Sequence, residues 1–557
     1  MSYDLTLDDS DFDPSEADDK QEKAVWIIEA PGKIRQMEAI LKDCPSMPRN
    51  TTVVVATKGH FIEMPEGIRN TGISTDFEEF ARVAKEDIVE RLLEAVSGAN
   101  SVYIATDADY EGNVIAVDVY DTIKGVFADP LRVKLKSLDD ESIRDALAEA
   151  EPINRNDATP GRTRAIIDRL IGSGFANKNI AAGRVKSAIL GIVGQGLLAP
   201  YRLYLTAPSR DETVWSCHVD VRDPLTLEIA NQLSKMKLPV LEENTVSFET
   251  PLPDDMGRIM VKAGDELDMS PLEASQAMQA AYESGRLSYP RSDARGLSRS
   301  AINKVGGIAK KNNLRFDRAV VKVKSDEDTH DSPYPVGDIN VNHDPKAVGG
   351  AEGIRVLIAR GLMNAGQKQK TATHKKGPLA AFLIAQGLTS DIAQLIDDLP
   401  WIKTRQLRMA GNKTKHGVFK RRTDTIILEK CVENGIGRPS TYAKHIEEFV
   451  NAGLVDIHTA RLTKAGEALL EKTPNALCNP AFSQAIEKAC RTPMKNGDAP
   501  WKELSARIVR NLPLEIRSVA ISVLSAPQIP AHDATNDLPA EDRAKPRLHT
   551  PSSSPWE

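Results

Sequence analysis

The chain has 557 residues, of which 41% are hydrophobic and 27% charged, as in ordinary globular proteins. This length predicts about three or four folding units. No run of about 18 apolar residues is present, and the acidic N-terminus lacks the apolar segment of a secretory signal, so no membrane association is expected. The five cysteines lie far apart without a C-x-x-C pair. This argues against a zinc ribbon and a disulfide framework and favours a reducing, cytoplasmic location.

The net charge of −7 comes from the N-terminus alone. Residues 1–23 contain nine acidic side chains against two lysines, so the rest of the chain is balanced. We expect residues 1–22 to form a disordered acidic tail. The negative total therefore does not argue against a basic groove for nucleic acid in the folded part.

Apolar strand-like runs and helical segments alternate at the start of the folded region. Strands are predicted at 24–28, 52–56 and 102–106, and helices at 34–41, 76–96 and 114–123. This alternation is typical of a parallel sheet covered on both faces. Further along, the sequence predicts helices over 151–199, strands over 213–265, a helix at 270–284, basic strands over 401–420, helices over 424–524 and a disordered tail over 527–557.

Four carboxylates follow predicted strands. Asp107, Asp109 and Glu111 come directly after one strand and Glu29 ends another. Ligands of open α/β sheets bind beyond the carboxyl ends of the strands, and several carboxylates gathered there repel one another unless a cation neutralises them. Oxygen ligands beside phosphate suit Mg²⁺. A solvated acidic turn is the alternative interpretation.

Lys33 lies where the first strand gives way to a helix. A helix start attracts phosphate through its free N–H groups and the helix dipole, so Lys33 is a candidate phosphate clamp; an ordinary surface lysine is the alternative. The segments Glu29-Ala-Pro-Gly-Lys33, Lys58-Gly-His60 and Asp107-Ala-Asp-Tyr-Glu-Gly112 resemble the Toprim domain of type IA topoisomerases, bacterial primases and some nucleases. That resemblance implies metal-assisted phosphodiester chemistry and leaves the reaction open.

A tyrosine segment narrows the reaction. Leu287-Ser-Tyr-Pro-Arg-Ser-Asp-Ala-Arg-Gly-Leu-Ser298 resembles the active-site segment of type IA topoisomerases, in which Arg follows the tyrosine by two residues. A phenol oxygen can attack a phosphodiester and hold the strand as an ester that is resealed without ATP. A guanidinium stabilises the charge that develops on the phosphate oxygens. An ordinary turn after a helix is the alternative for Tyr-Pro-Arg taken alone.

Three further segments match the same family in the same order. They are Asp168-Arg-Leu-Ile-Gly172 with Ala182-Gly-Arg-Val-Lys-Ser187, His330-Asp-Ser-Pro-Tyr-Pro335, and Gly435-Ile-Gly-Arg-Pro-Ser-Thr-Tyr-Ala443. Residues 24–500 therefore resemble a type IA DNA topoisomerase. The chain departs from the family pattern at Lys186, usually Gln, at Tyr334, usually Arg, and at Ala30 and Gly32, usually Ser and Ala. Features of topoisomerases I and III are mixed, so the subtype stays open.

The resemblance implies a role for each matched residue. The implied catalytic residues are Tyr289, Arg291, Glu29, Lys33 and His330, and the implied Mg²⁺ ligands are Glu29, Asp107, Asp109 and Glu111. The implied DNA-binding residues are His60, Arg169, Arg184, Lys186, Ser187, Arg438, Ser440 and Thr441. The expected reaction cuts one strand through a 5′-phosphotyrosine link, passes another strand and rejoins the first, relaxing negatively supercoiled DNA. No G-x-x-x-x-G-K-[ST] motif is present, so no ATP is expected.

The expected fold is multidomain α/β plus mostly α: a Rossmann-like Toprim sheet, helical winged-helix-type domains and a β-arch that closes a torus. The expected limits are a tail at 1–22, the Toprim domain at 23–150, a helical DNA-path segment at 151–212, the first part of the arch at 213–265, the tyrosine domain at 266–365, the second part of the arch at 366–420, a helical domain at 421–525 and a tail at 526–557. Residues 402–422 contain eight Lys or Arg and no acid, which favours DNA contact; a solvated basic ribbon is the alternative.

Two other functions remain open at this point. A Toprim nuclease or primase would use the same metal site without a covalent tyrosine, and a non-catalytic DNA-binding remnant would use neither. The expected partner is single-stranded or negatively supercoiled DNA, with RNA left open, and the protein is expected to be a monomer.

Overall fold

The computed structural model describes residues 22–44, 47, 51–65, 71–176, 183–211, 213–325, 330–404, 415–439, 441–495 and 497–526. The predicted tails (apart from residues 22 and 526), the middle of the basic stretch at 405–414, and Ser440 lie outside these residues. Within the described ranges, no helix combines the length and apolarity needed to cross a membrane.

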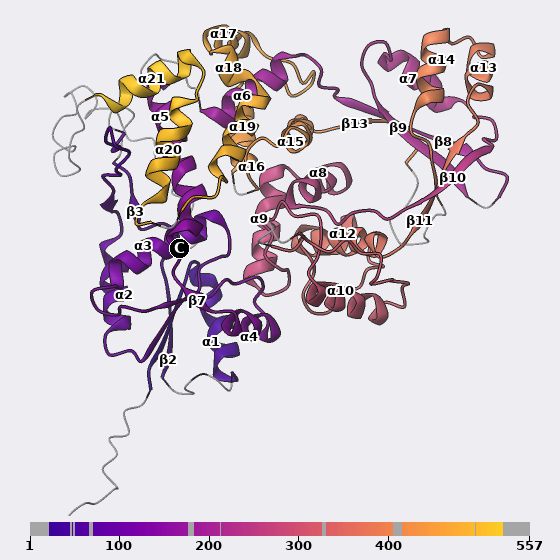
Figure 1. Ribbon diagram of the computed structural model, residues 1–557. Coiled ribbons are helices and arrows are strands. Elements are labelled where there is room, and N and C mark those ends of the chain that lie inside the picture. The colour runs from indigo at the N-terminus through magenta and orange to yellow at the C-terminus, as the bar shows by residue number, and fades with distance from the viewer. Residues whose placement is uncertain are drawn as a thin grey trace, which may run out of the picture.

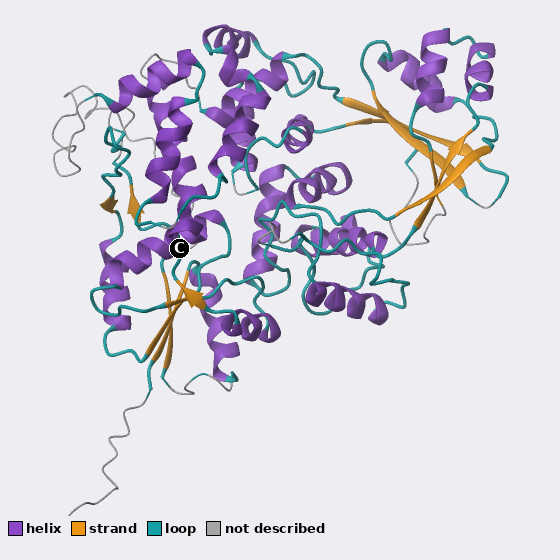
Figure 2. Ribbon diagram, in the orientation of Figure 1, coloured by secondary structure: helices purple, strands orange, loops and turns teal. Residues whose placement is uncertain are grey.

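A five-stranded sheet lies in the N-terminal part (Figures 1 and 2). Its order is β2-β1-β5-β6-β7, with β1 Ala24–Ile28, β2 Thr52–Ala56, β5 Ser101–Ile104, β6 Leu131–Arg132 and β7 Glu151–Pro152. All neighbours are parallel except β6 and β7. Strand β1 is buried along its whole length because it lies in the interior of the sheet and both of its faces are covered.

Alternate residues of β1 face two different helical layers. Trp26 and Ile28 pack with α1 Ile34–Lys42 and α4 Asp140–Ala148, whereas Val25 and Ile27 pack with α2 Glu86–Val96 and α3 Tyr110–Ile123. This arrangement confirms the predicted two-sided parallel sheet. The carboxyl ends of β1 and β5 place Glu29 and the acidic turn at one edge.

The helix predicted at 76–96 begins ten residues later, at Glu86. The residues before it instead form β4 Arg82–Val83, which pairs with β3 Ile62–Glu63. Phe77 has a φ of 64°, a left-handed conformation that is incompatible with a helix interior. Tertiary pairing therefore overrides the local helical pattern here.

A helical unit is built from two distant parts of the chain. The first part contributes η2 Arg155–Ala158, α5 Thr159–Ala176 and α6 Arg184–Gly194. The second part contributes the helices α15 Thr423–Glu433, α16 Tyr442–Asn451, α17 Lys464–Lys472, α18 Asn475–Cys478, α19 Pro480–Cys490, α20 Pro500–Arg510 and α21 Leu514–Leu524. Helix α5 shares one apolar core with α20 and α21. The predicted helical character of both parts agrees with the structure.

Two antiparallel sheets form an arch that runs out from the helical unit and back (Figure 1). The first has the order β12-β9-β8-β13, with β8 Tyr201–Pro208, β9 Val214–Asp220, β12 Ile402–Thr404 and β13 Gly417–Lys420; the second pairs β10 Glu243–Glu249 with β11 Gln369–His374. Helices α7 Leu227–Lys235, α13 Pro378–Ala385 and α14 Ser390–Asp398 cover the far end. The prediction of strands over 213–265 therefore missed helix α7. Strand β8 lies between that range and the helices predicted over 151–199, and neither prediction included it.

The arch leads back into the unit that carries Tyr289. This unit contains α8 Met256–Leu267, α9 Pro271–Glu283, α10 Arg299–Lys311, α11 Pro345–Val348 and α12 Gly350–Ala365. Its apolar core is continuous with residues of α6, α15 and α16, whereas Tyr282 and Tyr289 pack in the core of the Toprim sheet. These contacts close the chain into a ring.

Candidate active site

Tyr289 reaches the acidic edge of the sheet from the opposite unit. Its hydroxyl donates a hydrogen bond to Asp109 Oδ2 at 2.5 Å, and its backbone N–H donates to the Lys136 carbonyl at 3.0 Å. The side chain is 1% exposed. Burial, followed by the charge of Asp109, holds the pKa of Tyr289 well above its ordinary value. The phenol is therefore neutral and its proton already points at a carboxylate.

The acidic turn is rigidly built. Asp109 caps α3 by accepting from the Gly112 N–H at 2.7 Å, which leaves its second oxygen for Tyr289. A Cβ added at Gly112 would lie 2.0 Å from the Asp107 carbonyl oxygen, so only glycine fits this turn. The buried Arg132 donates to the carbonyls of Thr106 and Asp107 and fixes the backbone from behind.

Lys33 lies beside the same turn. It is buried, and its Nζ is 2.5 Å from Asp107 Oδ1. It is the last residue of the 3-10 turn η1 Pro31–Lys33 and directly precedes α1. The predicted clamp lysine therefore lies at a helix start and pairs with Asp107, two residues before the carboxylate that accepts from Tyr289.

Glu29 lies at the end of β1 with one oxygen, Oε2, buried and without a hydrogen-bond partner among the described residues. Burial, and then the charges of Asp107 and Asp109, raise the pKa of Glu29 to about 7. A carboxyl in this position can hold or release a proton near neutrality.

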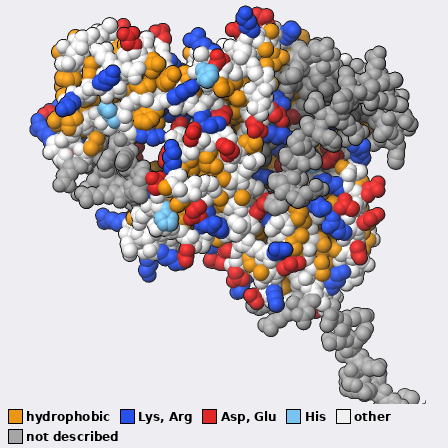
Figure 3. Space-filling model, turned by 180° about the vertical axis from the view of Figure 1, so that it is seen from behind, with side chains coloured by type: hydrophobic (Ala, Val, Ile, Leu, Met, Phe, Trp, Pro, Cys, Tyr) orange, Lys and Arg blue, Asp and Glu red, His pale blue; other side chains and the backbone are white. Residues whose placement is uncertain are grey.

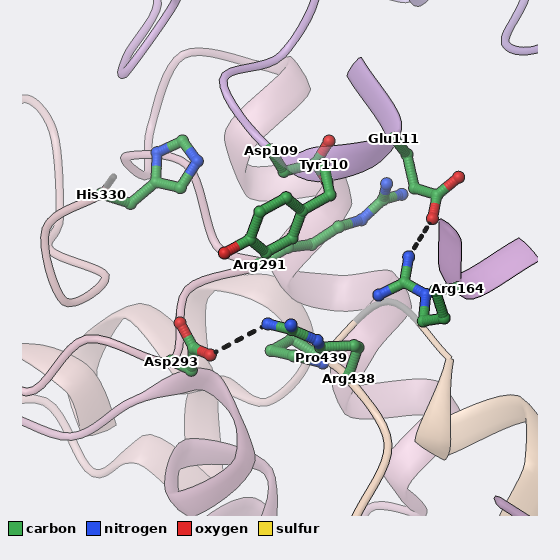
Figure 4. A pocket seen from close by; sticks show the side chains of 9 residues that line it. All are labelled: Asp109, Tyr110, Glu111, Arg164, Arg291, Asp293, His330, Arg438 and Pro439. Atoms are coloured by element: carbon green, nitrogen blue, oxygen red, sulfur yellow. Dashed lines mark hydrogen bonds and ion pairs between the residues drawn. The ribbon is translucent and has the colours of Figure 1, made fainter. Parts of the chain in front are cut away.

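A small pocket with a cavity volume of about 40 Å³ opens next to this cluster. Its lining includes Asp109, Glu111, Arg164, Arg291, His330 and Arg438 (Figure 4). Arg291 donates no hydrogen bond and forms no ion pair within the described part of the chain. Burial alone would lower the pKa of Arg291, but Tyr289 and the carboxylates around it raise it. A charged guanidinium without a fixed partner thus faces the pocket.

His330 is buried against Tyr289, the predicted nucleophile. The centroids of the His330 and Tyr289 rings are 4.5 Å apart, and neither ring nitrogen meets a hydrogen-bond partner among the described residues. The nearby Ala108 backbone and the aspartates favour the protonated ring, but burial has the larger effect and lowers the pKa of His330. The imidazole is therefore neutral, with one N–H available to a phosphate.

Glu111 has two basic partners. It pairs with Arg164, as Figure 4 shows, and with His60 Nε2 at 3.1 Å. These partners lower the pKa of Glu111 although burial opposes them. For His60 the signs are reversed: burial lowers the pKa of the imidazole, and the interaction with Glu111 raises it above the ordinary value.

The fit of a divalent cation differs among the four predicted ligands. No group of three or more His, Cys, Asp and Glu converges closely enough to hold a metal within the described ranges. Glu29, with its unpartnered oxygen, and the neighbouring Asp107 and Asp109 offer the hard oxygens that Mg²⁺ prefers. Glu111 is already paired with Arg164 and His60. Asp107 is likewise paired with Lys33 and Asp109 with Tyr289, so a bound cation would replace partners at all three carboxylates.

The structure places two predicted DNA-binding arginines in buried ion pairs. Arg184 is 2% exposed and bonds both oxygens of Asp168, and it bonds Glu487 at 2.8 Å. Arg438 bonds the other oxygen of Glu487 at 2.8 Å. Arg184 therefore cannot meet a phosphate in this arrangement, and its geometry is that of a support for Arg438.

The other DNA-binding candidates differ in how open they are. Lys186 is 42% exposed and pairs with Glu448 at 2.6 Å, whereas Ser187 is buried. Arg169 donates to the Thr71 carbonyl at 2.6 Å. Thr441 precedes α16. Among these, Lys186 is the one placed to exchange its partner for a phosphate.

The described ends of the basic stretch at 402–422 are largely neutralised by acids from other segments. Lys403 pairs with Asp211 and Glu243, and Arg421 with Asp265 and Glu429. The face seen in Figure 3 likewise intersperses Lys and Arg with Asp and Glu. The alternative of a solvated basic ribbon therefore does not describe Lys403 and Arg421, whose long-range ion pairs are invisible in the local composition, and DNA contact by this stretch stays a prediction.

Sequence reasoning missed several residues of the site. Tyr282 contacts Lys33 and Asp107. Arg132 bonds the Asp107 carbonyl, and Arg164 pairs with Glu111. Asp293 forms an ion pair with Arg491 at 2.9 Å. Asp293 also accepts from Arg438 at 3.3 Å, the pair drawn in Figure 4. Asp293 and Tyr282 lie within seven residues of Tyr289, and that proximity was the available signal.

Comparisons with known proteins agree with this geometry. The Toprim domain family matches residues 24–138. A plasmid DNA topoisomerase I of Xylella fastidiosa is 23% identical over 95% of this chain and 87% of its own, and DNA topoisomerase 1 of Aquifex aeolicus is 23% identical over 86% and 96%. The structure of full-length topoisomerase I from Thermotoga maritima has a TM-score of 0.58 at 18% identity, covering 90% of each chain. The predicted mixed α/β multidomain fold is thereby confirmed.

Proposed function

This chain belongs to the type IA topoisomerase family, and on that premise we propose that it cuts one DNA strand, passes another through the break and rejoins the first, relaxing negatively supercoiled DNA without ATP. The observation that carries this proposal is the 2.5 Å hydrogen bond from the Tyr289 hydroxyl to Asp109 of the opposite unit. A single chain supplies both sides of this site, which supports action as a monomer. The proposed setting is the cytoplasm.

The chemical step follows from these positions. The Tyr289 oxygen forms a bond to phosphorus while the bond from phosphorus to the 3′ oxygen breaks, and Tyr289 stays on the 5′ phosphate. The phenolic proton passes to Asp109, which already accepts it. Glu29 donates a proton to the leaving 3′ oxygen and takes it back on rejoining.

Three side chains are placed to stabilise the negative charge that develops on the phosphate. Arg291 faces the pocket with its guanidinium free of fixed partners among the described residues. Lys33 is a second cation at the helix start, and His330 lies against the Tyr289 ring. Such prepositioned donors stabilise a transition state more than the ground state.

Glu29, Asp107 and Asp109 would hold Mg²⁺, with Glu111 as a further predicted ligand. When bound, the cation would offset the repulsion between these carboxylates and the phosphate. Tyr289 in turn must become accessible to DNA, because it is sealed between the two units. Separation of the tyrosine unit from the Toprim sheet is therefore part of the proposed cycle.

Chelation of Mg²⁺ with EDTA is expected to abolish plasmid relaxation but to leave formation of a denaturation-resistant protein–DNA adduct. The reason is that Tyr289, Arg291 and Lys33 suffice for cleavage, whereas the cut ends must be held beside mutually repelling carboxylates for rejoining. Gel relaxation and adduct precipitation measure the two steps. Relaxation that persists in EDTA would contradict the proposed metal role.

Lys186→Gln is expected to weaken binding of a single-stranded oligonucleotide and to reduce the slope of log affinity against log salt by about 0.7, the value for one lost phosphate contact. Lys235→Gln, on α7 at the far end of the arch, is the control and should leave the slope unchanged. Fluorescence anisotropy across a salt series measures both. Equal slopes for Lys186→Gln and wild type would show that Lys186 contacts no phosphate of the bound DNA.

The proposed function is tested by incubating negatively supercoiled plasmid with the protein and Mg²⁺. A ladder of partly relaxed topoisomers is the expected product. Accumulation of nicked circles without a ladder of covalently closed topoisomers, or without any protein-bound DNA, would favour the Toprim nuclease instead. A DNA-binding remnant would leave the plasmid unchanged.

A further inference from the structure

A second buried tyrosine, Tyr282, lies beside the nucleophile. It belongs to the last turn of α9 and is fully buried. Its hydroxyl donates to Asp107 Oδ1 at 3.2 Å and lies 3.5 Å from Lys33 Nζ. Lys33 Nζ is itself 2.5 Å from the same Asp107 oxygen. Lysine and phenol thus donate to the same carboxylate oxygen.

The ring of Tyr282 makes two further contacts. Lys33 Nζ lies 4.5 Å from the ring centroid, within the range of a cation–π interaction. The rings of Tyr282 and Tyr289 meet edge to face, with centroids 5.4 Å apart and an angle of 83°. The ring therefore touches both the clamp lysine and the nucleophile, so its hydroxyl can be removed without removing this packing.

The hydroxyl of Tyr282 acts as a donor. It lies 3.2 Å from Asp107 Oδ1, and a carboxylate oxygen can only accept this hydrogen bond. A buried carboxylate oxygen that loses its donor is costly. If Lys33 turned from Asp107 to a phosphate, the phenol would remain as a donor to that oxygen.

We propose that Tyr282 is a positioning residue that holds Asp107 Oδ1 while Lys33 moves to the scissile phosphate. Lys33 and Asp107 belong to the Toprim sheet, whereas Tyr282 belongs to the tyrosine unit, so this exchange is available only when the two units are closed. Lys33 is thereby released for the reaction at the moment when Tyr289 is in place. The inference rests on the proposed strand cleavage.

Tyr282→Phe tests the inference, because it removes the hydroxyl and keeps the ring. Single-turnover formation of the covalent adduct with a single-stranded oligonucleotide, measured in EDTA, is expected to slow about 10- to 100-fold, the effect of one hydrogen bond to a charged group. The oligonucleotide dissociation constant and the melting temperature should stay close to wild type. Tyr334→Phe is the matched control: this buried tyrosine of the same unit reaches Ser142 of the Toprim domain, and its loss should not change the rate.

A double-mutant cycle with Lys33→Gln shows whether Tyr282 acts through the lysine. The double variant should be no slower than Lys33→Gln alone, because Tyr282 has no lysine left to release. The inference would be overturned, with the proposed function left intact, by either of two results. One is a double variant slowed by the product of the two single-variant rate losses, and the other is a Tyr282→Phe rate equal to that of wild type. Absence of any adduct from wild-type protein would overturn the proposed function itself.

Discussion

Replacing Tyr289 by Phe is expected to abolish both the covalent adduct and plasmid relaxation. The variant loses the oxygen that bonds to phosphorus. The turnover rate of an enzyme that loses its covalent nucleophile falls by on the order of a million-fold. The ring remains, so its contacts with His330 and Tyr282 should persist. Gel relaxation and adduct precipitation measure the loss.

The control for this variant is DNA affinity. Tyr289→Phe should bind a single-stranded oligonucleotide about as well as wild type, because a sealed phenol makes no contact with free DNA before the units open. Retained relaxation in Tyr289→Phe would contradict the assignment of the nucleophile. Tyr282→Phe, which should still form the adduct, separates the two buried tyrosines.

Arg291→Lys is expected to slow cleavage about 100-fold or more, the usual cost of losing one prepositioned transition-state donor. Lysine keeps the charge but loses the planar fork that can span two phosphate oxygens. The effect should therefore fall on the rate of adduct formation more than on oligonucleotide affinity. Single-turnover rates and anisotropy measure the two quantities.

Arg295→Lys is the matched control for Arg291. Arg295 belongs to the same loop, but it donates to the Pro253 carbonyl instead of lining the pocket. Its replacement should leave cleavage close to wild type. Equal losses in both variants would mean that the loop is merely disturbed, and the proposed role of Arg291 would be contradicted.

The tyrosine unit is closed against the Toprim sheet and the helical unit. Tyr289 is sealed, and Asp293, four residues further on, is held by Arg438 and Arg491 of the helical unit. Lys304 adds a bond from the tyrosine unit to Asp139 of the Toprim domain at 2.9 Å. A DNA strand must displace several of these contacts before it can reach Tyr289.

Much of the site could be predicted from the sequence because its residues stand in short, ordered motifs. Glu29, Lys33 and Asp109 follow strand ends of one sheet, so their convergence follows from parallel topology. The approach of Tyr289 from another unit came from the family resemblance, not from local pattern. The individual roles of these residues remain predictions for the experiments above.

The rest depended on contacts between distant residues. Arg184 carries a motif associated with DNA, yet it pairs with Glu487 some three hundred residues later, which no local pattern indicates. Glu111 was grouped with its neighbours by spacing, but the turn sends it to Arg164 and His60. Strand β8 and helix α7 were missed because pairing and packing in the arch outweigh local propensity.

The most direct test of a covalent Tyr289 intermediate uses one oligonucleotide labelled at either end. After cleavage and denaturation, the 3′-end label should remain on the protein and the 5′-end label should be released, with the DNA-bearing peptide containing Tyr289 by mass spectrometry. Retention of the 5′-end label, or DNA on any other residue, would contradict a 5′-phosphate bond to this tyrosine.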